Sequence, residues 1–287
     1  MSKFNLINID TSFESYQQLI NLYNENKDRQ FETIEISFQQ WFAANLSSAL
    51  GGVMDKLLGD LNTIRFNDIS PDILTIIQKN DFLSHFGYQR VTDINNTTIR
   101  YLKLKPSDGR YFHRYVLKEL LDRPELSIMS SALKRKIAES IYEIFVNAQI
   151  HSESDFIYTC GQFFPTKHTI EFTITDTGVG FRKRVNSRFE KKLSSVQAIK
   201  WAMKDGHSTK QGISGGIGLA ILKEFVILNK SKIQIISDDG FYQLDPNGVQ
   251  TRLFSGSFPG TIINMEFKTD NVTSYSLISE TESDELF

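Results

Sequence analysis

Four short stretches decide the fold of this 287-residue chain: EIFVNAQIH at 143–151, DTGVG at 176–180, GGIGLA at 215–220 and PGT at 259–261. The first lies in a helical pattern of apolar residues, the second follows a strand pattern, and the third opens another helical pattern. Each stretch is a weak signal by itself. In this order they indicate a nucleotide pocket divided between a helix, a glycine turn and the start of a second helix.

The first stretch belongs to a helix predicted over about 130–150. Glu139, Glu143, Asn147 and His151 recur every four residues, so they share one ridge of this helix, away from its apolar stripe. Most such ridges are solvated faces. Asn is a poor residue inside a helix, because its amide competes for backbone hydrogen bonds. A carboxylate one turn before an amide oxygen suits a general base beside a metal ligand.

The second stretch places Asp176 at the end of a strand predicted over 169–175, where its carboxylate can accept a hydrogen bond from a ligand amine. Gly178 and Gly180 permit positive φ and a close approach of the backbone to a ligand. Asp-Thr-Gly is also the signature of aspartic proteases. That function needs a second equivalent triplet, and the sequence contains no second Asp-Thr/Ser-Gly, so the triplet does not support a protease.

The third stretch gathers Gly215, Gly216 and Gly218 directly before a helix predicted over 218–228. Backbone N–H groups at a helix start, together with the helix dipole, favour a phosphate. The pattern is not a Walker P-loop, because no Gly-Lys-Ser/Thr occurs. It is not the dinucleotide fingerprint either, because a long polar segment at 182–212 precedes it instead of a strand. These glycines therefore indicate a phosphate site only in combination with the other stretches.

Composition excludes several classes of function. The net charge of -2 gives no basic field for nucleic acid. A single cysteine, Cys160, excludes an intrachain disulfide framework and suits a reducing compartment. The first residues, MSKFNLINID, lack the basic region and apolar run of a signal peptide, and no stretch approaches the ~18 uninterrupted apolar residues of a membrane span. We therefore expect a cytoplasmic protein.

Strand and helix patterns alternate in the N-terminal part of the chain. Strands are predicted at about 4–9, 31–38 and 63–66, and helices at about 13–23, 39–58 and 71–77. This alternation predicts a small α/β domain over 1–105. It looks similar to the sulfate-transporter and anti-sigma-antagonist (STAS) type by fold-level analogy only, since that family's Asp-Ser-Ser-Gly phosphoacceptor stretch is missing. A second domain is expected over 106–270 and a loose acidic tail over 271–287.

Taken together, the four stretches resemble the ATP-binding domain shared by type II topoisomerases, ninety-kilodalton heat-shock chaperones, histidine kinases and mismatch-repair ATPases, the Bergerat-fold or GHKL family. The resemblance covers about 130–268. It implies an α+β fold, a two-layer α/β sandwich with helices on one face of a mixed sheet, preceded here by the small α/β domain. The nucleotide would lie between these helices and a mobile lid, for which the polar segment 182–212 is the candidate.

The resemblance assigns a role to each motif residue. It implies that Asn147 binds Mg²⁺, that Glu143 is the general base, and that Asp176 reads the adenine amino group of ATP. Thr261 would support the adenine end of the pocket beside Asp176. The remaining implied contacts are Gly178 and Gly180 at the adenine, and Gly216, Gly218 and the lid residue Lys210 at the phosphates.

These assignments predict a cytoplasmic, Mg-ATP-binding regulatory protein that has a protein partner and no role for nucleic acid or membrane. It would hydrolyse ATP or transfer the γ-phosphate to a serine or threonine, as anti-sigma-type kinases do. A nucleotide-gated interaction module without turnover stays open, as does the oligomeric state. A sensor histidine kinase is disfavoured, because His113 lies only 34 positions before Asn147 and His85 is followed by the helix-breaking Phe-Gly-Tyr.

Overall fold

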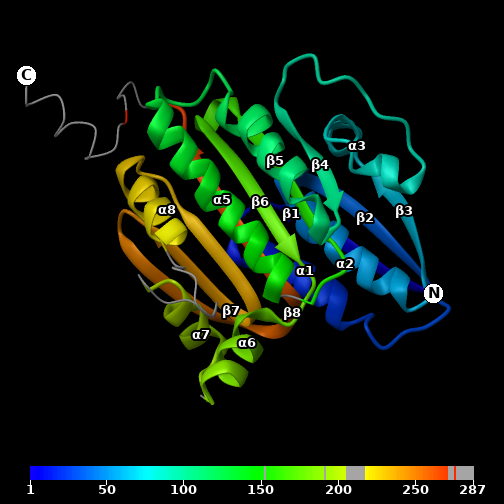
Figure 1. The fold of residues 1–287 in the computed structure, drawn as a ribbon. Helices are drawn as coiled ribbons and strands as arrows, with labels where there is room; N and C mark the ends of the chain where they lie inside the picture. The colour runs from blue at the N-terminus through cyan, green and yellow to red at the C-terminus, as the bar shows by residue number, and fades with distance from the viewer. Residues whose placement is uncertain (152, 191, 205–216, 271–274, 276–287) are drawn as a thin grey trace, which may run out of the picture.

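The computed structural model describes residues 1–151, 153–190, 192–204, 217–270 and 275. It contains two β-sheets with helices packed against them, so the fold class is mixed α and β, as expected (Figure 1). A three-stranded sheet belongs to the N-terminal part of the chain, and a five-stranded sheet to the C-terminal part. None of the described helices combines the length and the apolar character that crossing a membrane requires.

The N-terminal part alternates strands and helices as predicted. Its elements are β1 (Ser2–Ile9), α1 (Phe13–Asn24), β2 (Thr33–Phe42), α2 (Ser47–Gly59), β3 (Thr63–Ile69) and α3 (Pro71–Lys79). The three strands are parallel, in the order β1-β2-β3. Two helix starts follow directly from the sequence: Ser12 Oγ accepts the N–H of Ser15 at the start of α1, and Pro71 is the first residue of α3.

The helix predicted over 39–58 is wrong at its first residues. Strand β2 continues to Phe42, a short 3₁₀ turn follows at Ala44–Leu46, and α2 begins only at Ser47. Phe42 is buried and packs edge-on against Phe38, with ring centroids 5.2 Å apart. This aromatic contact keeps the strand going past the point where the spacing of apolar residues indicated a helix.

The C-terminal part forms an antiparallel sheet in the order β4-β5-β6-β8-β7. Its strands are β4 (Thr98–Leu104), β5 (Ile157–Phe164), β6 (Thr169–Asp176), β7 (Ile233–Asp245) and β8 (Gly248–Lys268). Its helices are α4 (Gly109–Tyr115), continued by a π-helical turn at Val116–Leu121, then α5 (Ser131–His151), α6 (Gly180–Phe189), α7 (Ser195–Ala202) and α8 (Ile217–Leu228). Strand β4 precedes residue 105, so this sheet begins within the range predicted for the first domain.

Strands β7 and β8 form a long hairpin whose outer half reaches α1. Their pairing shifts register around Asp238, which bends the hairpin. Beyond the bend, Phe13 of α1 stacks on Phe254 with ring centroids 4.3 Å apart and meets Phe241 edge-on at 5.5 Å. The Arg252 guanidinium lies 3.5 Å from the centroid of the Phe13 ring. The hairpin therefore joins the two parts of the chain.

Helices cover both faces of the five-stranded sheet, and its strand pairs are all antiparallel, so the expected two-layer arrangement of a mixed sheet with helices on one face is wrong. On one face α4, α5 and α8 share a core with strand residues such as Phe172 and Ile263, and α5 and α8 lie in front of the sheet in Figure 1. On the other face, Tyr158 and Ile262 join a second core with residues of α1 and α2 and with Ile36 of β2. One hydrophobic core thus spans the N-terminal part and the far face of the five-stranded sheet.

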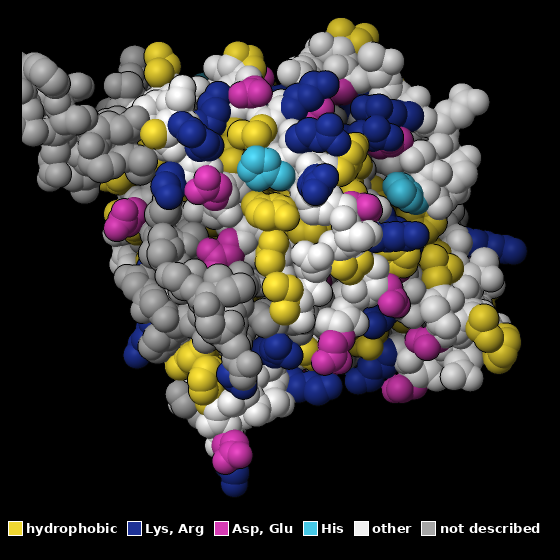
Figure 2. Space-filling model, in the orientation of Figure 1, with side chains coloured by type: hydrophobic (Ala, Val, Ile, Leu, Met, Phe, Trp, Pro, Cys, Tyr) yellow, Lys and Arg dark blue, Asp and Glu magenta, His cyan; other side chains and the backbone are white. Residues whose placement is uncertain are grey.

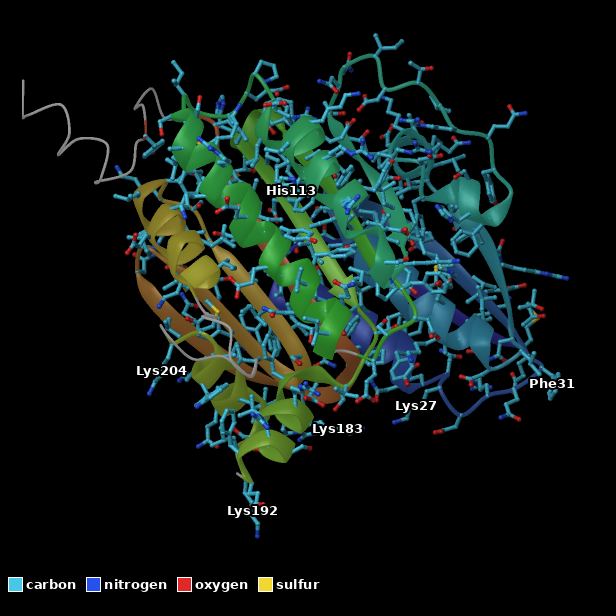
Figure 3. All side chains as sticks on the ribbon, in the orientation of Figure 1. Lys27, Phe31, His113, Lys183, Lys192 and Lys204 are labelled. Atoms are coloured by element: carbon cyan, nitrogen blue, oxygen red, sulfur yellow. The ribbon has the colours of Figure 1, made fainter. Side chains whose placement is uncertain are left out.

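The polar segment 182–212, expected to be a loop-like lid, is helical over most of its described residues. Helices α6 and α7 pack beside one another and against β7. Val185 and Ile199 are buried, and a Cβ on Gly240 would come within 3.1 Å of Ile199, so this glycine admits α7 against the strand. The loop expectation is wrong here because these few apolar residues are enough to anchor the two helices. Figure 3 shows Lys183, Lys192 and Lys204 projecting outward from this helical hairpin and its end.

Within the predicted acidic tail, 271–287, Tyr275 is the residue that the structure describes. Its N–H donates to the carbonyl of Ile128, and its carbonyl accepts the N–H of Ser130, both at 2.9 Å. Its ring lies 5.7 Å from that of Phe225 on α8. Residue 275 therefore lies where the start of α5 meets α8, and the rest of the predicted tail lies outside the described residues.

Candidate functional site

Strand register brings Asp176 and Thr261 together. They are directly paired residues of β6 and β8, and Thr261 is in turn paired with Ser237 of β7. Side chains alternate between the two faces of a sheet. All three therefore lie on the same face as Ile174 and Ile263, two residues away along β6 and β8, which belong to the core under α5 and α8. A row of three polar side chains closes this apolar face at one end.

The Asp176 carboxylate is buried and has spare capacity to accept hydrogen bonds. Its residue is only 8% exposed, and Gly178 N–H donates to Oδ1 at 2.9 Å. Among the described residues this is the one hydrogen bond that the carboxylate receives, whereas an ionised carboxylate can accept about four. Burial raises the pKa of Asp176 to about 7, against the opposing effects of the Gly178 N–H and the charge of Lys56. A ligand N–H would satisfy this oxygen pair.

Glycine at position 260 lets β8 lie directly against the end of β6. Gly260 has φ of 145°, and a Cβ at this position would lie 2.1 Å from the carbonyl oxygen of Asp176. Any side chain would push the two strands apart at the point where Asp176 and Thr261 pair. The Pro-Gly-Thr stretch thus has a steric reason for its glycine, which the sequence alone did not give.

The two glycines after Asp176 have different roles. Gly180 has φ of 69° and begins α6, and a Cβ there would lie 2.9 Å from Ser237 Oγ. Gly178 is not among the described glycines with a positive φ, so the conformational freedom of glycine is used at Gly180 and not at Gly178. It contributes instead by donating its N–H to Asp176.

Two serines that the sequence reasoning missed hold this end of the sheet in place. Ser237 Oγ accepts the N–H of Phe181 at 2.9 Å and lies 3.3 Å from Thr261 Oγ1, so it ties the start of α6 to β7 and β8. On the other side, Ser154 Oγ accepts the N–H of Thr177 at 3.1 Å. The role of Ser237 follows from the register of β7, which pairs it with Thr261.

The predicted ridge of α5 becomes more buried toward its C-terminal end. Glu139 is exposed, whereas Glu143 and Asn147 are half-buried. Helix α5 packs beside α8, and its C-terminal end lies at the same end of the sheet as Asp176 (Figure 1). Within the described part of the chain, the Asn147 side chain makes no hydrogen bond. The ridge is thus partly covered at Glu143 and Asn147, the predicted base and metal ligand. It is exposed one turn earlier, at Glu139.

The predicted phosphate contacts are described only in part. Gly218 lies in the first turn of α8, which begins at Ile217, close to the predicted start. Lys210 and Gly216 lie outside the described residues. Helix α8 nevertheless follows the α6–α7 hairpin in the chain and packs beside α5. Glu143, Asn147, Asp176 and Thr261 therefore come from elements that meet around one end of the sheet.

The donor set suits magnesium held mainly by phosphate oxygens. Among the described residues, no group of three or more His, Cys, Asp and Glu side chains could hold a metal ion. Mg²⁺ usually takes one or two protein oxygens and completes its shell with water and substrate phosphates. The amide oxygen of Asn147 fits that habit, whereas an all-protein metal cage does not fit the described residues.

Comparison with known proteins gives no independent assignment. No protein-family model matches the chain, and a search of curated proteins finds no match to it. The candidate site therefore rests on its geometry: a buried carboxylate with unused acceptor positions, a glycine that lets two strands meet, and a half-buried Glu–Asn pair on the helix that packs over the same face.

Proposed function

We propose that this protein is a Mg-ATP-binding regulatory protein of the Bergerat-fold type. In this proposal it hydrolyses ATP or transfers the γ-phosphate to a serine or threonine of a partner protein. The observation that carries the proposal is the Asp176 carboxylate, buried at the end of β6 with one hydrogen bond from the described residues. Perturbed carboxyl groups of this kind gather at binding sites, because burial without a ligand is unfavourable.

Adenine supplies the groups that this end of the sheet lacks. Its exocyclic amine would donate to Asp176, and Thr261, paired with Asp176 across the strands, offers a hydroxyl beside it. The fold arrangement supports the same proposal, since α5 and α8 share one face of an antiparallel sheet and a helical hairpin, α6–α7, follows the Asp176 turn. In the Bergerat arrangement, that hairpin corresponds to the beginning of the lid.

The proposed reaction uses the two half-buried residues of α5. Asn147 would hold Mg²⁺, which neutralises charge on the phosphates. Glu143 lies one turn earlier and would take the proton from a water or a serine or threonine hydroxyl. The oxygen of that nucleophile bonds to the γ-phosphorus while the bond to the β–γ bridging oxygen breaks, and ADP leaves. The contribution of a positioned base is roughly 10²–10⁴-fold in rate.

The proposal is tested with γ-labelled ATP and Mg²⁺, with and without cell extract, on the parent chain and on Glu143→Ala. We expect the variant to bind ATP nearly as well as the parent and to lose phosphate transfer by at least about a hundredfold. Glu139→Ala is the matched control, because Glu139 lies one turn earlier on the same ridge with its side chain 57% exposed. The control should keep both binding and transfer.

Three results of this experiment have different meanings. Loss of transfer in Glu143→Ala but not in Glu139→Ala supports an enzyme with Glu143 as its base. Transfer at the parent rate in Glu143→Ala removes that residue from the reaction. ATP binding by the parent without transfer to water or to any partner would make the protein a nucleotide-gated interaction module.

A further inference from the structure

The hairpin of α6 and α7 carries an excess of positive charge. Among its described residues, 180–190 and 192–204, Glu190 is the one acidic residue. The basic residues of the same ranges are Arg182, Lys183, Arg184, Arg188, Lys192, Lys200 and Lys204. The whole chain has a net charge of -2, so this excess is local. Figure 2 shows Lys and Arg side chains around the end of the molecule where Figure 1 places α6 and α7.

Four lysines of this hairpin are exposed and have no carboxylate partner among the described residues. They are Lys183, Lys192, Lys200 and Lys204. Arg182 differs, because its guanidinium lies 3.4 Å from Asp238 Oδ1 on β7. Lys200 lies in the last turn of α7, and Lys204 follows that turn, so two like charges are close together and face solvent. An acidic ligand on this side of the hairpin would offset their repulsion.

An acidic segment of the same chain is available for this surface. Residues 276–287, which follow Tyr275, read SLISETESDELF and contain no lysine or arginine. The acidic residues of this segment are Glu280, Glu282, Asp284 and Glu285. The segment therefore has the opposite charge to the hairpin and offers a carboxylate for each of its exposed lysines.

The residue that precedes this segment lies near the end of α7. Tyr275 Oη donates to the carbonyl of Leu228, at the end of α8, at 3.5 Å. Lys223 lies five residues earlier in α8, roughly 7–8 Å along the helix axis, and its Nζ donates to the Met203 carbonyl at 3.2 Å. Met203 directly precedes Lys204. With the length of the Lys223 side chain included, Tyr275 and the end of α7 are roughly 20 Å apart.

The length of the segment matches this separation. Glu280 and Glu285 are five and ten residues beyond Tyr275, and an extended chain advances about 3.3 Å per residue. The acidic residues can therefore reach points roughly 16–33 Å from Tyr275, a range that includes the end of α7.

Several basic residues nearer to Tyr275 already have acidic partners. At the start of α5, Lys134 Nζ lies 3.0 Å from Asp122 Oδ1. At the end of β8, Lys268 Nζ lies 3.2 Å from Glu266 Oε1. The hairpin lysines differ from these residues, because no described carboxylate competes with the segment for them.

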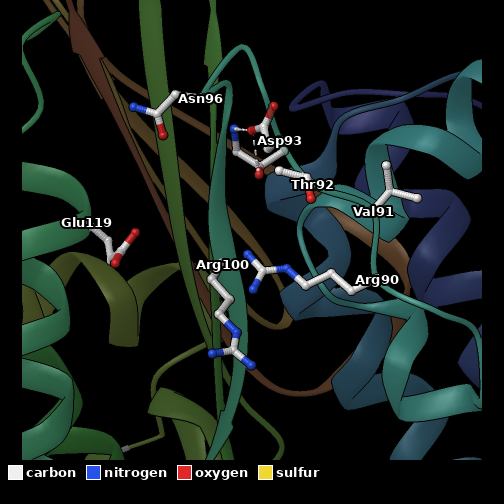
Figure 4. A pocket seen from close by; sticks show the side chains of 8 residues that line it. Arg90, Val91, Thr92, Asp93, Asn96, Arg100 and Glu119 are labelled. Carbon is white, nitrogen blue, oxygen red and sulfur yellow. Dashed lines mark hydrogen bonds between the residues drawn. The ribbon is translucent and has the colours of Figure 1, made fainter.

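A second gathering of basic residues, at the pocket ahead of β4, has no comparable excess of positive charge. Figure 4 shows Arg90 and Arg100 in this pocket together with Asp93 and Glu119. Arg100 is paired with Asp81, whose Oδ2 lies 2.7 Å from Nε and 2.6 Å from Nη2. The carboxylates that line the pocket offset the charge of Arg90, so this pocket does not compete for an acidic segment.

We propose that the acidic segment 276–287 docks on the α6–α7 hairpin, with Lys200 and Lys204 as its main contacts. Exposed ion pairs are individually weak and are screened by salt, so the contact weakens as the salt concentration rises. The docked segment restrains the hairpin that follows the Asp176 turn and thereby regulates access to that end of the sheet. The docking itself does not depend on nucleotide binding at Asp176.

The test is zero-length cross-linking of the full chain with a water-soluble carbodiimide, read by mass spectrometry. The reagent forms an amide between a carboxylate and an amine that are in contact, and it becomes a urea as it takes up the water released. We expect amide links from the acidic residues of 276–287 to Lys200 or Lys204. Lys27 is the matched control, because it is an exposed lysine on another side of the molecule (Figure 3). Its links should be at least about tenfold fewer.

Protection of the lysines is measured on a full-chain variant in which the carboxylates of the segment are neutralised: Glu280→Gln, Glu282→Gln, Asp284→Asn and Glu285→Gln. We expect an amine-reactive reagent to acetylate Lys200 and Lys204 at least about threefold faster in this neutralised variant than in the parent. Acetylation of Lys27 should be unchanged. Sodium chloride at about 0.5 M should produce the same increase in the parent. A thermal melt verifies that the neutralised variant is folded.

The proposal is overturned if the segment forms no link to Lys200 or Lys204, or if it links to Lys27, Lys134 or Lys230 as strongly. Links found only between chains, in a mixture of unlabelled and isotope-labelled protein, would contradict docking within one chain. Equal acetylation of Lys200 and Lys204 in the parent and the neutralised variant would also contradict it.

Discussion

The two faces of the five-stranded sheet are both buried, yet they differ in chemistry. The face under α5 and α8 is built from apolar side chains such as Phe172, Ile174, Ile263 and Met265. The opposite face, under α1 and α2, has a polar centre: Glu171, Thr173, Gln234 and Asn264 are all buried there. Adjacent residues of the same strands therefore enter two different environments.

The buried side chains of the polar face are held together by hydrogen bonds. Asn264 Nδ2 donates to Glu171 Oε2 at 2.8 Å, and its Oδ1 accepts from Thr173 Oγ1 at 2.7 Å and from Asn45 Nδ2 at 3.2 Å. Thr11, just ahead of α1, donates to Glu171 Oε1 at 3.0 Å. Because Asn45 and Thr11 come from the N-terminal part, this network fixes that part to the sheet.

The two faces of the sheet therefore contact different parts of the molecule. The polar face binds the N-terminal part of the chain through specific bonds. The apolar face packs against helices and ends in the polar row Asp176, Thr261 and Ser237, where hydrogen-bonding capacity is left unused at Asp176. The buried Glu171 carboxylate of the polar face thus accepts hydrogen bonds from Thr11 and Asn264, whereas the Asp176 carboxylate receives one hydrogen bond from the described residues, that of Gly178.

The largest expected effect comes from breaking the polar network. Asn264→Ala leaves Glu171, Thr173 and Asn45 without their shared partner in a fully buried position. We expect a loss of about 3–4 kcal/mol in the free energy of unfolding, measured by urea denaturation. Ile263→Val, the adjacent residue on the apolar face, should lose only about 1 kcal/mol. Equal losses in the two variants would contradict the contrast between the faces.

Asp176→Asn is expected to raise the free energy of unfolding at pH 8, by less than Asn264→Ala lowers it. Burial raises the pKa of Asp176 to about 7 from its ordinary value of 3.8, so the folded state holds its proton more tightly than the unfolded state. The stability of the parent should therefore fall as pH rises from about 4 to 7, and not change further from this group above 7. The uncharged variant avoids this loss.

Asp176→Asn should accordingly exceed the parent in free energy of unfolding by on the order of 2–3 kcal/mol at pH 8, and match it near pH 4. Urea denaturation of both proteins across this pH range measures the difference. A variant that is less stable than the parent at pH 8 would mean that the carboxylate is satisfied within the protein and is not kept for a ligand.

Sequence patterns predicted most of the elements because they depend on local spacing. The helix at 130–150 and the strand ending at Asp176 agree with α5 and β6 to within about a residue. The aspartate and glycines at 176–180 indicated a binding turn only in combination with the other three stretches. The family resemblance implied that Thr261 lies near Asp176, but the direct pairing of the two residues was not predicted, since strand register is not encoded in either stretch alone.

The rest could not be predicted because it depends on distant contacts. Alternation of polar and apolar residues in β6 is typical of a sheet with one solvated face. Glu171 and Thr173 are buried nevertheless, because α1, α2 and the turn before α2 cover them. Likewise, nothing local showed that Gly260 must avoid a clash with Asp176 or that Ser237 would join α6 to the sheet.

The most direct test of the account is a calorimetric titration of Mg-ATP into the parent, Asp176→Asn and Glu171→Gln at pH 8. Both variants neutralise a buried carboxylate of β6, one on each face. We predict that Glu171→Gln keeps the ATP affinity of the parent, while Asp176→Asn loses it by roughly 30-fold or more, the effect of a lost charged hydrogen bond. Unchanged ATP affinity in folded Asp176→Asn, or equal losses in both variants, would contradict a ligand site at the end of the apolar face.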